Sequence, residues 1–244
     1  MTTDNWPVDF RYISKRLVRE IVQQHEAAAG RALGGARLRF GPISLPLGKR
    51  VPDYKNPFEL VRRATVAVSD NTGTLERPGE YVRAMVDLRE GYINLFLRER
   101  HPPVKVAVMS ADVEVPHVGR TLAVLLGSLS NYRHRRSEDY RGAGLPSDVS
   151  GCYEILERVR ERGDPRIDTS HFRRGAGYHS DILVDSALKL KYELAEIVPL
   201  EYLELLARIF FVVEDHTWKG TEYDRVLVGA PVWVATPGPL EPGA

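Results

Sequence analysis

The clearest pattern in the chain begins at residue 81, where apolar and polar side chains alternate through residue 89. Side chains that alternate in this way point to opposite faces of a half-buried β-strand. Glu90-Gly91 is typical of a tight turn, and the alternation resumes over residues 92–97. The pattern therefore predicts a β-hairpin at residues 81–97.

Further apolar stretches extend this hairpin into a sheet that we expect to be mostly an antiparallel meander. Alternating valines predict a third strand at residues 104–108, with an extension to Val115. Residues 121–126 are apolar throughout, which indicates a central strand covered on both faces. Residues 226–235 also have strand character, and because a glycine and Pro231 interrupt them, we expect this strand at a sheet edge.

Helical periodicity, in which apolar side chains recur every three or four residues, occurs in much of the remaining chain. The helices that it predicts lie at about residues 15–29, 57–68, 149–163, 183–197 and 199–213. A short strand at residues 10–13 precedes the first of them. In the last, which begins at Pro199, we expect Leu203, Leu206 and Phe210 to face inward.

The composition is that of an ordinary globular protein. The 244 residues are 43% hydrophobic and 27% charged, which provides enough apolar surface for a sizeable core. Because no linker or internal repeat divides the chain, we expect a single α+β domain over residues 1–244. It would consist of a largely antiparallel sheet with helices packed on it. Residues 1–8 and 237–244 are expected to form flexible tails.

Charge and cysteine content limit the partners and the cellular compartment that we expect for the protein. Lys and Arg total 34 against 33 Asp and Glu, a formal net charge of +1, so we do not expect bulk binding of nucleic acid. No apolar run approaches the roughly 20 residues of a membrane span, and we expect neither a membrane association nor a signal peptide. The single cysteine, Cys152, permits no intramolecular disulfide, which suits a reducing cytoplasm.

The first candidate site is the loop that follows the expected central strand. Small and hydroxyl side chains come first and arginines follow, an arrangement that can surround a phosphate or carboxylate with N–H donors. The residues that would bind an anion here are Ser128, Ser130, Asn131, Arg133, Arg135 and Arg136. The simpler alternative is a solvated charged loop in which Glu138 and Asp139 pair with the arginines.

A second candidate site lies just before the expected helix at residues 183–197. A glycine-containing loop that enters a helix is a natural anion site, because the first N–H groups of the helix are unpaired and its dipole favours negative charge. Arg173, Arg174 and a helix start at Ser180 would form it. The alternative is an ordinary loop with a helix cap. We expect the two loops to meet at one end of the sheet.

Catalytic and metal-binding motifs are missing from the sequence. It contains no Gly-x-Ser-x-Gly elbow and no phosphate-binding P-loop. The spacing of His171 and His179 matches no zinc pattern, so we expect no metal, and nothing specifies a cofactor. Cys152 falls on the apolar side of its expected helix and is more simply a core thiol than a nucleophile.

Four short segments resemble an actinobacterial protein family described as a domain of unknown function. They are Arg11-Tyr-Ile-Ser-Lys-Arg-Leu-Val18, Val124-Leu-Leu-Gly-Ser-Leu-Ser-Asn131, Leu200-Glu-Tyr-Leu-Glu-Leu-Leu-Ala207 and Val226-Leu-Val-Gly-Ala-Pro-Val-Trp-Val234. The resemblance spans nearly the whole chain. Members of that family are thought to accompany predicted conflict or signalling modules, which implies a sensing or adaptor role. The family brings no established activity, cofactor or catalytic residues.

These observations favour a non-catalytic sensor or adaptor domain that binds a small anionic ligand, such as a nucleotide. One alternative is a hydrolase for a phosphorylated substrate, with His171 or His179 as general base and the arginines holding the charge. Another is a plain protein-interaction domain whose loops contact a partner protein. The lack of a recognisable nucleophile or metal set favours the sensor.

Overall fold

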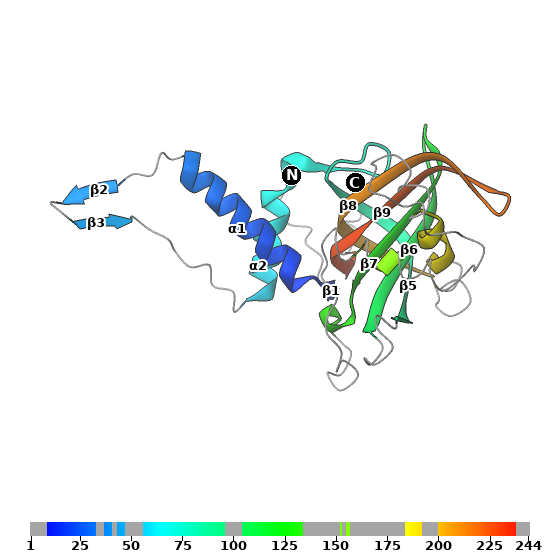
Figure 1. The fold of residues 1–244 in the computed structure, drawn as a ribbon, viewed down its shortest axis with the longest axis horizontal. Helices are drawn as coiled ribbons and strands as arrows, with labels where there is room; N and C mark the ends of the chain where they lie inside the picture. Colours follow the sequence, from blue (N-terminus) through cyan, green and yellow to red (C-terminus); the bar gives the residue numbers. More distant parts are fainter. Residues whose placement is uncertain are drawn as a thin grey trace, which may run out of the picture. The chain divides into compact units, whose positions relative to one another are not determined.

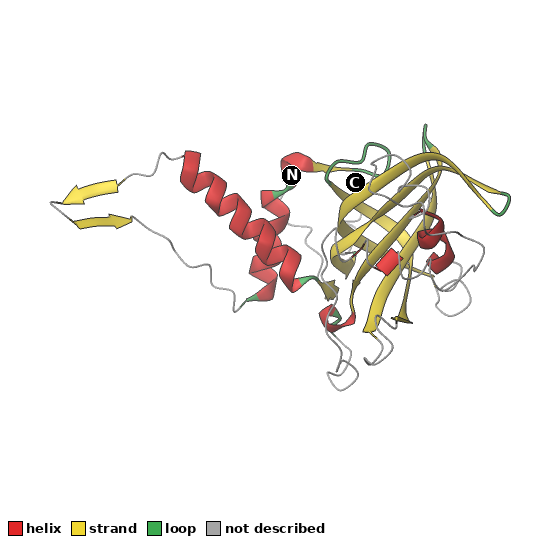
Figure 2. Cartoon of the chain, in the orientation of Figure 1, coloured by secondary structure: helices red, strands yellow, loops and turns green. Residues whose placement is uncertain are grey.

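The computed structural model describes residues 9–32, 37–40, 43–46, 56–95, 104–133, 152, 155–156, 184–191 and 200–237. The chain divides into two compact units, residues 1–14 with 71–244 and residues 15–70. Strands dominate the first unit, and helices dominate the second (Figure 2). The expected α+β class is therefore confirmed, and the single domain stays a prediction. Both expected tails lie outside the described residues, apart from Pro237.

Seven strands form the sheet of the first unit, and five of its seven pairings are antiparallel, as predicted. In chain order they are β1 (Asp9–Ile13), β4 (Thr72–Gly73), β5 (Tyr81–Leu95), β6 (Val104–Val115), β7 (Gly119–Ser128), β8 (Leu200–Trp218) and β9 (Thr221–Thr236). β5 pairs with β6, β6 with β7, β7 with β9, β9 with β8, and β8 again with β5. These five strands therefore close into a ring (Figure 1).

One hydrophobic cluster, to which all five strands contribute, fills the inside of the ring. Its members are Tyr12, Val86, Leu88, Ala107, Met109, Ala111, Ala123, Leu125, Leu129, Leu203, Leu205, Ala207, Leu227 and Val234. Alanines are frequent among them because a small ring leaves little room inside. Leu75, which precedes β5, also packs against this cluster. The Leu75 backbone is held there by Arg225, whose Nη1 donates to the carbonyl oxygens of Leu75 and Glu76, each at 2.9 Å. The ring therefore encloses a packed core.

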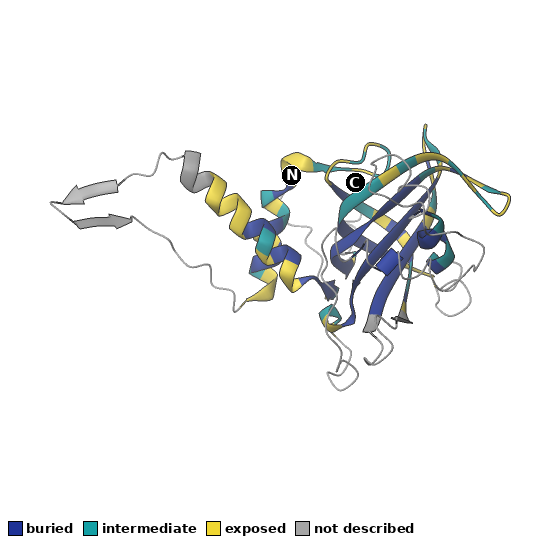
Figure 3. Ribbon diagram, viewed as in Figure 1, coloured by how far each residue is buried: buried dark blue, intermediate teal, exposed yellow. Residues whose placement is uncertain are grey.

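A second cluster covers the outer side of β6, β7 and β9, where dark buried residues continue from the strands into helical segments (Figure 3). Its helical members are Cys152, Ile155, Leu156, Val184, Ala187, Leu188 and Leu190. Residues 184–191 are helical, and the burial of Ala187 and Leu190 agrees with the inward stripe predicted for this segment. Cys152 is buried in the same cluster, as expected of a core thiol. The outer face of the ring is thus partly covered by helix.

The turn expected at Glu90-Gly91 is wrong, because β5 runs through it as one strand of 15 residues. Residues 81–89 pair with β8 and residues 89–95 pair with β6, so the strand changes partner at this point. A glycine inside a strand allows a tight bend, which the closure of the ring requires here. The predicted extension of β6 to Val115 and the double-sided burial of β7 are confirmed.

The helix expected at residues 199–213 is also wrong, since β8 occupies this segment. Residues 203–207 are all buried, and they alternately face the interior cluster and the opposite side of the strand. A strand that is buried on both faces lacks a regular alternation of apolar and polar residues, and the leucines of β8 also fit helical spacing. Glu204, the one charged residue of this stretch, accepts a hydrogen bond from Arg83 Nε at 2.7 Å. β8 turns into β9 at Lys219-Gly220, where both residues have positive φ, as tight hairpin turns require. This dipeptide is the signal in the sequence that marks the hairpin.

The sheet-edge position expected for residues 226–235 is wrong as well, because β9 has partners on both sides. β8 lies along one side, whereas β7 and then β1 lie along the other. Pairing with β7 ends at Gly229, and pairing with β1 begins at Trp233. Pro231 falls in the gap between these two pairings, which explains how a proline fits into a strand inside the sheet.

The second unit contains two helices and a two-stranded hairpin, namely α1 (Lys15–Ala32), α2 (Pro57–Ala67), β2 (Arg37–Phe40) and β3 (Ile43–Pro46). Both helices begin where the sequence predicts, and they contact each other. The Asn56 side chain caps α2 by accepting the N–H groups of Phe58 and Glu59, at 3.0 and 3.3 Å. Within the described part of the chain, no helix is long and apolar enough to cross a membrane.

Candidate functional site

The first candidate loop of the sequence, which begins at Ser128, contacts β1. Ser128 ends β7, and the short 3-10 helix η2 (Leu129–Asn131) follows it. The Ser128 N–H and the Asn131 side-chain amide both donate to the Tyr12 hydroxyl, at 3.2 and 3.0 Å. The hydroxyls of Ser128 and Ser130 contact each other at 2.8 Å. These polar groups therefore fasten the end of β7 to β1.

The other nominated residues are placed only in part. Arg133 is exposed, and its backbone N–H donates to the Arg11 carbonyl oxygen at 3.0 Å. The nominated residues that lie outside the described part of the chain are Arg135, Arg136, Arg173, Arg174 and Ser180, together with His171 and His179. The expected meeting of the two loops lies outside it too. Anion binding by these residues stays a prediction.

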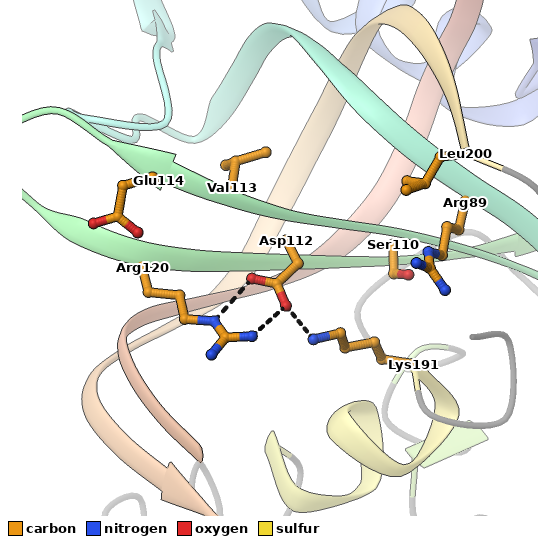
Figure 4. Close-up of a pocket in the computed structure, with 8 residues that line it drawn as sticks. All are labelled: Arg89, Ser110, Asp112, Val113, Glu114, Arg120, Lys191 and Leu200. Atoms are coloured by element: carbon orange, nitrogen blue, oxygen red, sulfur yellow. Dashed lines mark hydrogen bonds and ion pairs between the residues drawn. The ribbon is translucent and has the colours of Figure 1, made fainter. Parts of the chain in front are cut away.

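A pocket of about 530 Å³ opens on the outer side of the ring, at the point where β5 parts from β6 (Figure 4). The strands β5, β6, β7 and β8 line it, together with the helical segment at residues 184–191. Its lining residues are Arg89, Ser110, Asp112, Val113, Glu114, Arg120, Lys191 and Leu200. Ser110, Asp112 and Glu114 occupy alternate positions of β6 and therefore share one face of that strand.

Asp112 lies at the centre of the pocket between two cations (Figure 4). Arg120 Nε and Nη2 donate to its two carboxylate oxygens at 3.1 and 3.0 Å, a bidentate pair. The Lys191 ammonium donates to the same carboxylate. Burial raises the pKa of Asp112, but the hydrogen bonds and charges of Arg120 and Lys191 outweigh it and hold the pKa below its usual value. Asp112 is therefore ionised at neutral pH.

Tyr223 of β9 supports both cations. Lys191 Nζ donates to the Tyr223 hydroxyl at 2.7 Å and lies 5.0 Å from the centre of its ring. The Arg120 guanidinium carbon lies 4.9 Å from the same ring centre, and the Arg120 backbone N–H donates to the Asp224 carboxylate at 2.7 Å. Cations are attracted to aromatic faces, and the Tyr223 ring is buried. Lys191 and Arg120 are thus oriented by the protein itself.

The charged side chains of the pocket can bind an oxyanion, and its central carboxylate is a poor proton acceptor. Three cationic side chains and two carboxylates line the pocket, a net charge of +1, which favours ligands of negative charge. Arg and Lys donors form strong charge-assisted hydrogen bonds to carboxylate and phosphate. A carboxylate with a lowered pKa is a weak proton acceptor at neutral pH, so Asp112 is a poor general base. Of the residues described, no group of three or more His, Cys, Asp or Glu is placed to hold a metal ion.

Sequence reasoning missed this pocket entirely. Arg89 is a polar position of the alternating pattern at residues 81–89, and no motif singles out Asp112 or Arg120. Only the register of β5, β6 and β7 brings the three residues together. A local signal does exist in β6. Its outward positions are apolar as far as Val108 and polar at residues 110–114. Such a change along one face marks where the hydrophobic cover of a sheet ends and a surface site can begin.

Comparisons with known proteins leave the pocket as the basis for any functional assignment. No family model, curated protein or solved structure matches the chain. The family resemblance of the four short segments therefore stays a prediction. The geometry and charge of the pocket are therefore the observations that bear on function, because a fold by itself does not specify one.

Proposed function

We propose that the protein is a non-catalytic binding domain, of the sensor or adaptor type, that takes up a small anionic ligand in this pocket. The observation that carries the proposal is the convergence of Arg89, Arg120 and Lys191 on one open cavity. Asp112 and Tyr223 already orient two of these cations. Because little side-chain freedom remains to be lost, a ligand binds there at a lower entropic cost.

The proposed ligand is a small molecule that carries a carboxylate or a phosphate. A cavity of about 530 Å³ falls in the size range of small-molecule sites. Leu200 contributes an apolar wall, and the Ser110 hydroxyl can donate or accept a hydrogen bond. Six of the eight lining residues are polar or charged, so hydrogen bonds and ion pairs would dominate the binding of a ligand here.

Calorimetric titration with inorganic phosphate, AMP and hexanoate tests the proposal. The wild-type protein is expected to bind at least one of these anions. Arg89→Gln is expected to weaken that binding roughly tenfold or more, since a charge-assisted hydrogen bond contributes about 1.5–3 kcal/mol. Arg133→Gln removes the same charge from the loop after β7 and is the matched control, with unchanged affinity as the expected result.

Two results would contradict the proposal. If none of the three anions binds to the wild-type protein, the pocket is not an anion site. If Arg133→Gln weakens binding and Arg89→Gln does not, the anion binds at the loop nominated by the sequence instead. Chromatography of the recovered ligand separates a sensor from a hydrolase, because a sensor returns the bound AMP intact, whereas a hydrolase would consume it.

A further inference from the structure

One carboxylate of the pocket, that of Glu114, is not used by the cluster around Asp112. Glu114 lies directly opposite Arg120 in the register of β6 and β7. Side chains of opposite charge in such positions usually interact, yet the Arg120 guanidinium reaches diagonally to Asp112. Among the residues that the structure describes, Glu114 has no hydrogen-bond or ion-pair partner.

Positive and negative charge are therefore separated along the pocket. Arg89 lies beside Ser110 at one end, the cations around Asp112 occupy the middle, and Glu114 lies at the other end (Figure 4). A strand rises about 3.3 Å per residue, so about 13 Å of β6 separates Ser110 from Glu114 and about 7 Å separates Asp112 from Glu114. A ligand that lies along β6 meets a cationic end and an anionic end.

We infer that the ligand is a zwitterion, whose carboxylate or phosphate binds at the Arg89 end and whose ammonium group binds to Glu114. This inference rests on the proposed function, because it concerns the same pocket. A second negative charge on the ligand would be repelled by Glu114. An ammonium group at that position forms a charge-assisted hydrogen bond instead. The pocket thus selects amine-bearing acids over compounds with two acidic ends.

Three probes of equal chain length test this inference. Hexanoate, 6-aminohexanoate and adipate share one carboxylate and carry a methyl, an ammonium and a second carboxylate at the far end. In calorimetric titrations of the wild-type protein, 6-aminohexanoate is expected to bind most tightly and adipate most weakly. The affinity for 6-aminohexanoate is expected to be roughly fivefold higher than the affinity for hexanoate, a difference that corresponds to one exposed ion pair.

Variants of Glu114 test whether this carboxylate causes the preference for 6-aminohexanoate over hexanoate. Glu114→Gln is expected to abolish the advantage of 6-aminohexanoate over hexanoate, and Glu114→Asp to retain part of it. Glu222→Gln changes an exposed carboxylate near the turn between β8 and β9 and is expected to preserve the full advantage. Because both glutamates are exposed, each variant is expected to unfold at the wild-type urea concentration.

The failure of the inference and the failure of the proposed function give different results. Equal affinity for 6-aminohexanoate and hexanoate, or a preference that survives in Glu114→Gln, would overturn the inference and leave the anion site in place. Binding of phosphate or AMP without binding of 6-aminohexanoate would also overturn the inference and leave the anion site in place. If the wild-type protein binds none of these anions, the proposed function fails, and the inference fails with it.

Discussion

Gly229 of β9 packs against the backbone carbonyl oxygen of Arg208 in β8, so closely that a β-carbon at residue 229 would overlap that oxygen. The register of the two strands shifts on either side of Arg208, after residue 206 and again after residue 209. Shifts of this kind increase the local twist of a strand pair. Glycine is therefore required where β8 and β9 coil around each other and close the ring.

Gly229→Ala is expected to destabilise the protein by at least about 1–3 kcal/mol, because the added methyl group forces the backbones of β8 and β9 apart. Urea denaturation measures this change. Thr236→Ala, at the exposed end of the same strand, is the control and is expected to change stability by less than about 0.5 kcal/mol. Equal stability of the two variants would show that the approach of the two strands is not tight.

Tyr12→Phe is expected to destabilise the protein by about 1–3 kcal/mol, because two donors lose their shared acceptor. These donors are the Ser128 N–H and the Asn131 side-chain amide, and the Tyr12 side chain is fully buried. Tyr202→Phe removes a hydroxyl from a side chain that is 56% exposed and serves as the control in urea denaturation. If both variants match the wild type, the phenol does not fasten β7 to β1.

The stability contributed by Asp112 is expected to depend on pH. Because its pKa is lowered in the folded protein, the unfolded chain binds the proton more readily. The contribution is therefore complete above the unfolded pKa of about 3.9 and is lost as the pH falls through the folded value. Asp112→Asn is expected to be less stable than the wild type at about pH 6.5 and to approach it at a pH well below the unfolded pKa of about 3.9.

Urea unfolding of both proteins at the two pH values measures this effect. A difference in the free energy of unfolding that stays constant from the higher to the lower pH would contradict it. In that case the Asp112 side chain would contribute through its shape and its neutral hydrogen bonds, without a net contribution from its charge beside Arg120 and Lys191.

The sequence predicts best those elements whose two faces differ. The starts of α1 and α2 and the alternation of β5 follow from local pattern and capping, since each presents one apolar and one polar side. β8 is buried on both sides over residues 203–207, and periodicity then does not separate strand from helix. Gly91 and Pro231 act as breakers in most strands, whereas here they lie where β5 and β9 change partners.

The sequence does not predict the candidate pocket, and the reason is different. Arg89, Asp112 and Arg120 come from three strands, and Lys191 comes from a helical segment much later in the chain. Their convergence is a property of strand register and ring closure, which no single segment encodes. The loop at Ser128 has the composition of an anion site, but its composition fits equally the hydrogen bonds to Tyr12 that the structure contains.

A two-dimensional ¹H–¹⁵N NMR titration with inorganic phosphate tests most directly whether a small anion binds beside Arg89 and Lys191. Backbone amide shifts locate a bound ligand in the wild-type protein without any substitution. The expected result is a set of saturable shifts concentrated at residues 110–114 and at Arg89 and Arg120, with little change at residues 128–133. Saturable shifts concentrated at residues 128–133, or no saturable shifts with any of phosphate, AMP and hexanoate, would contradict the proposed site.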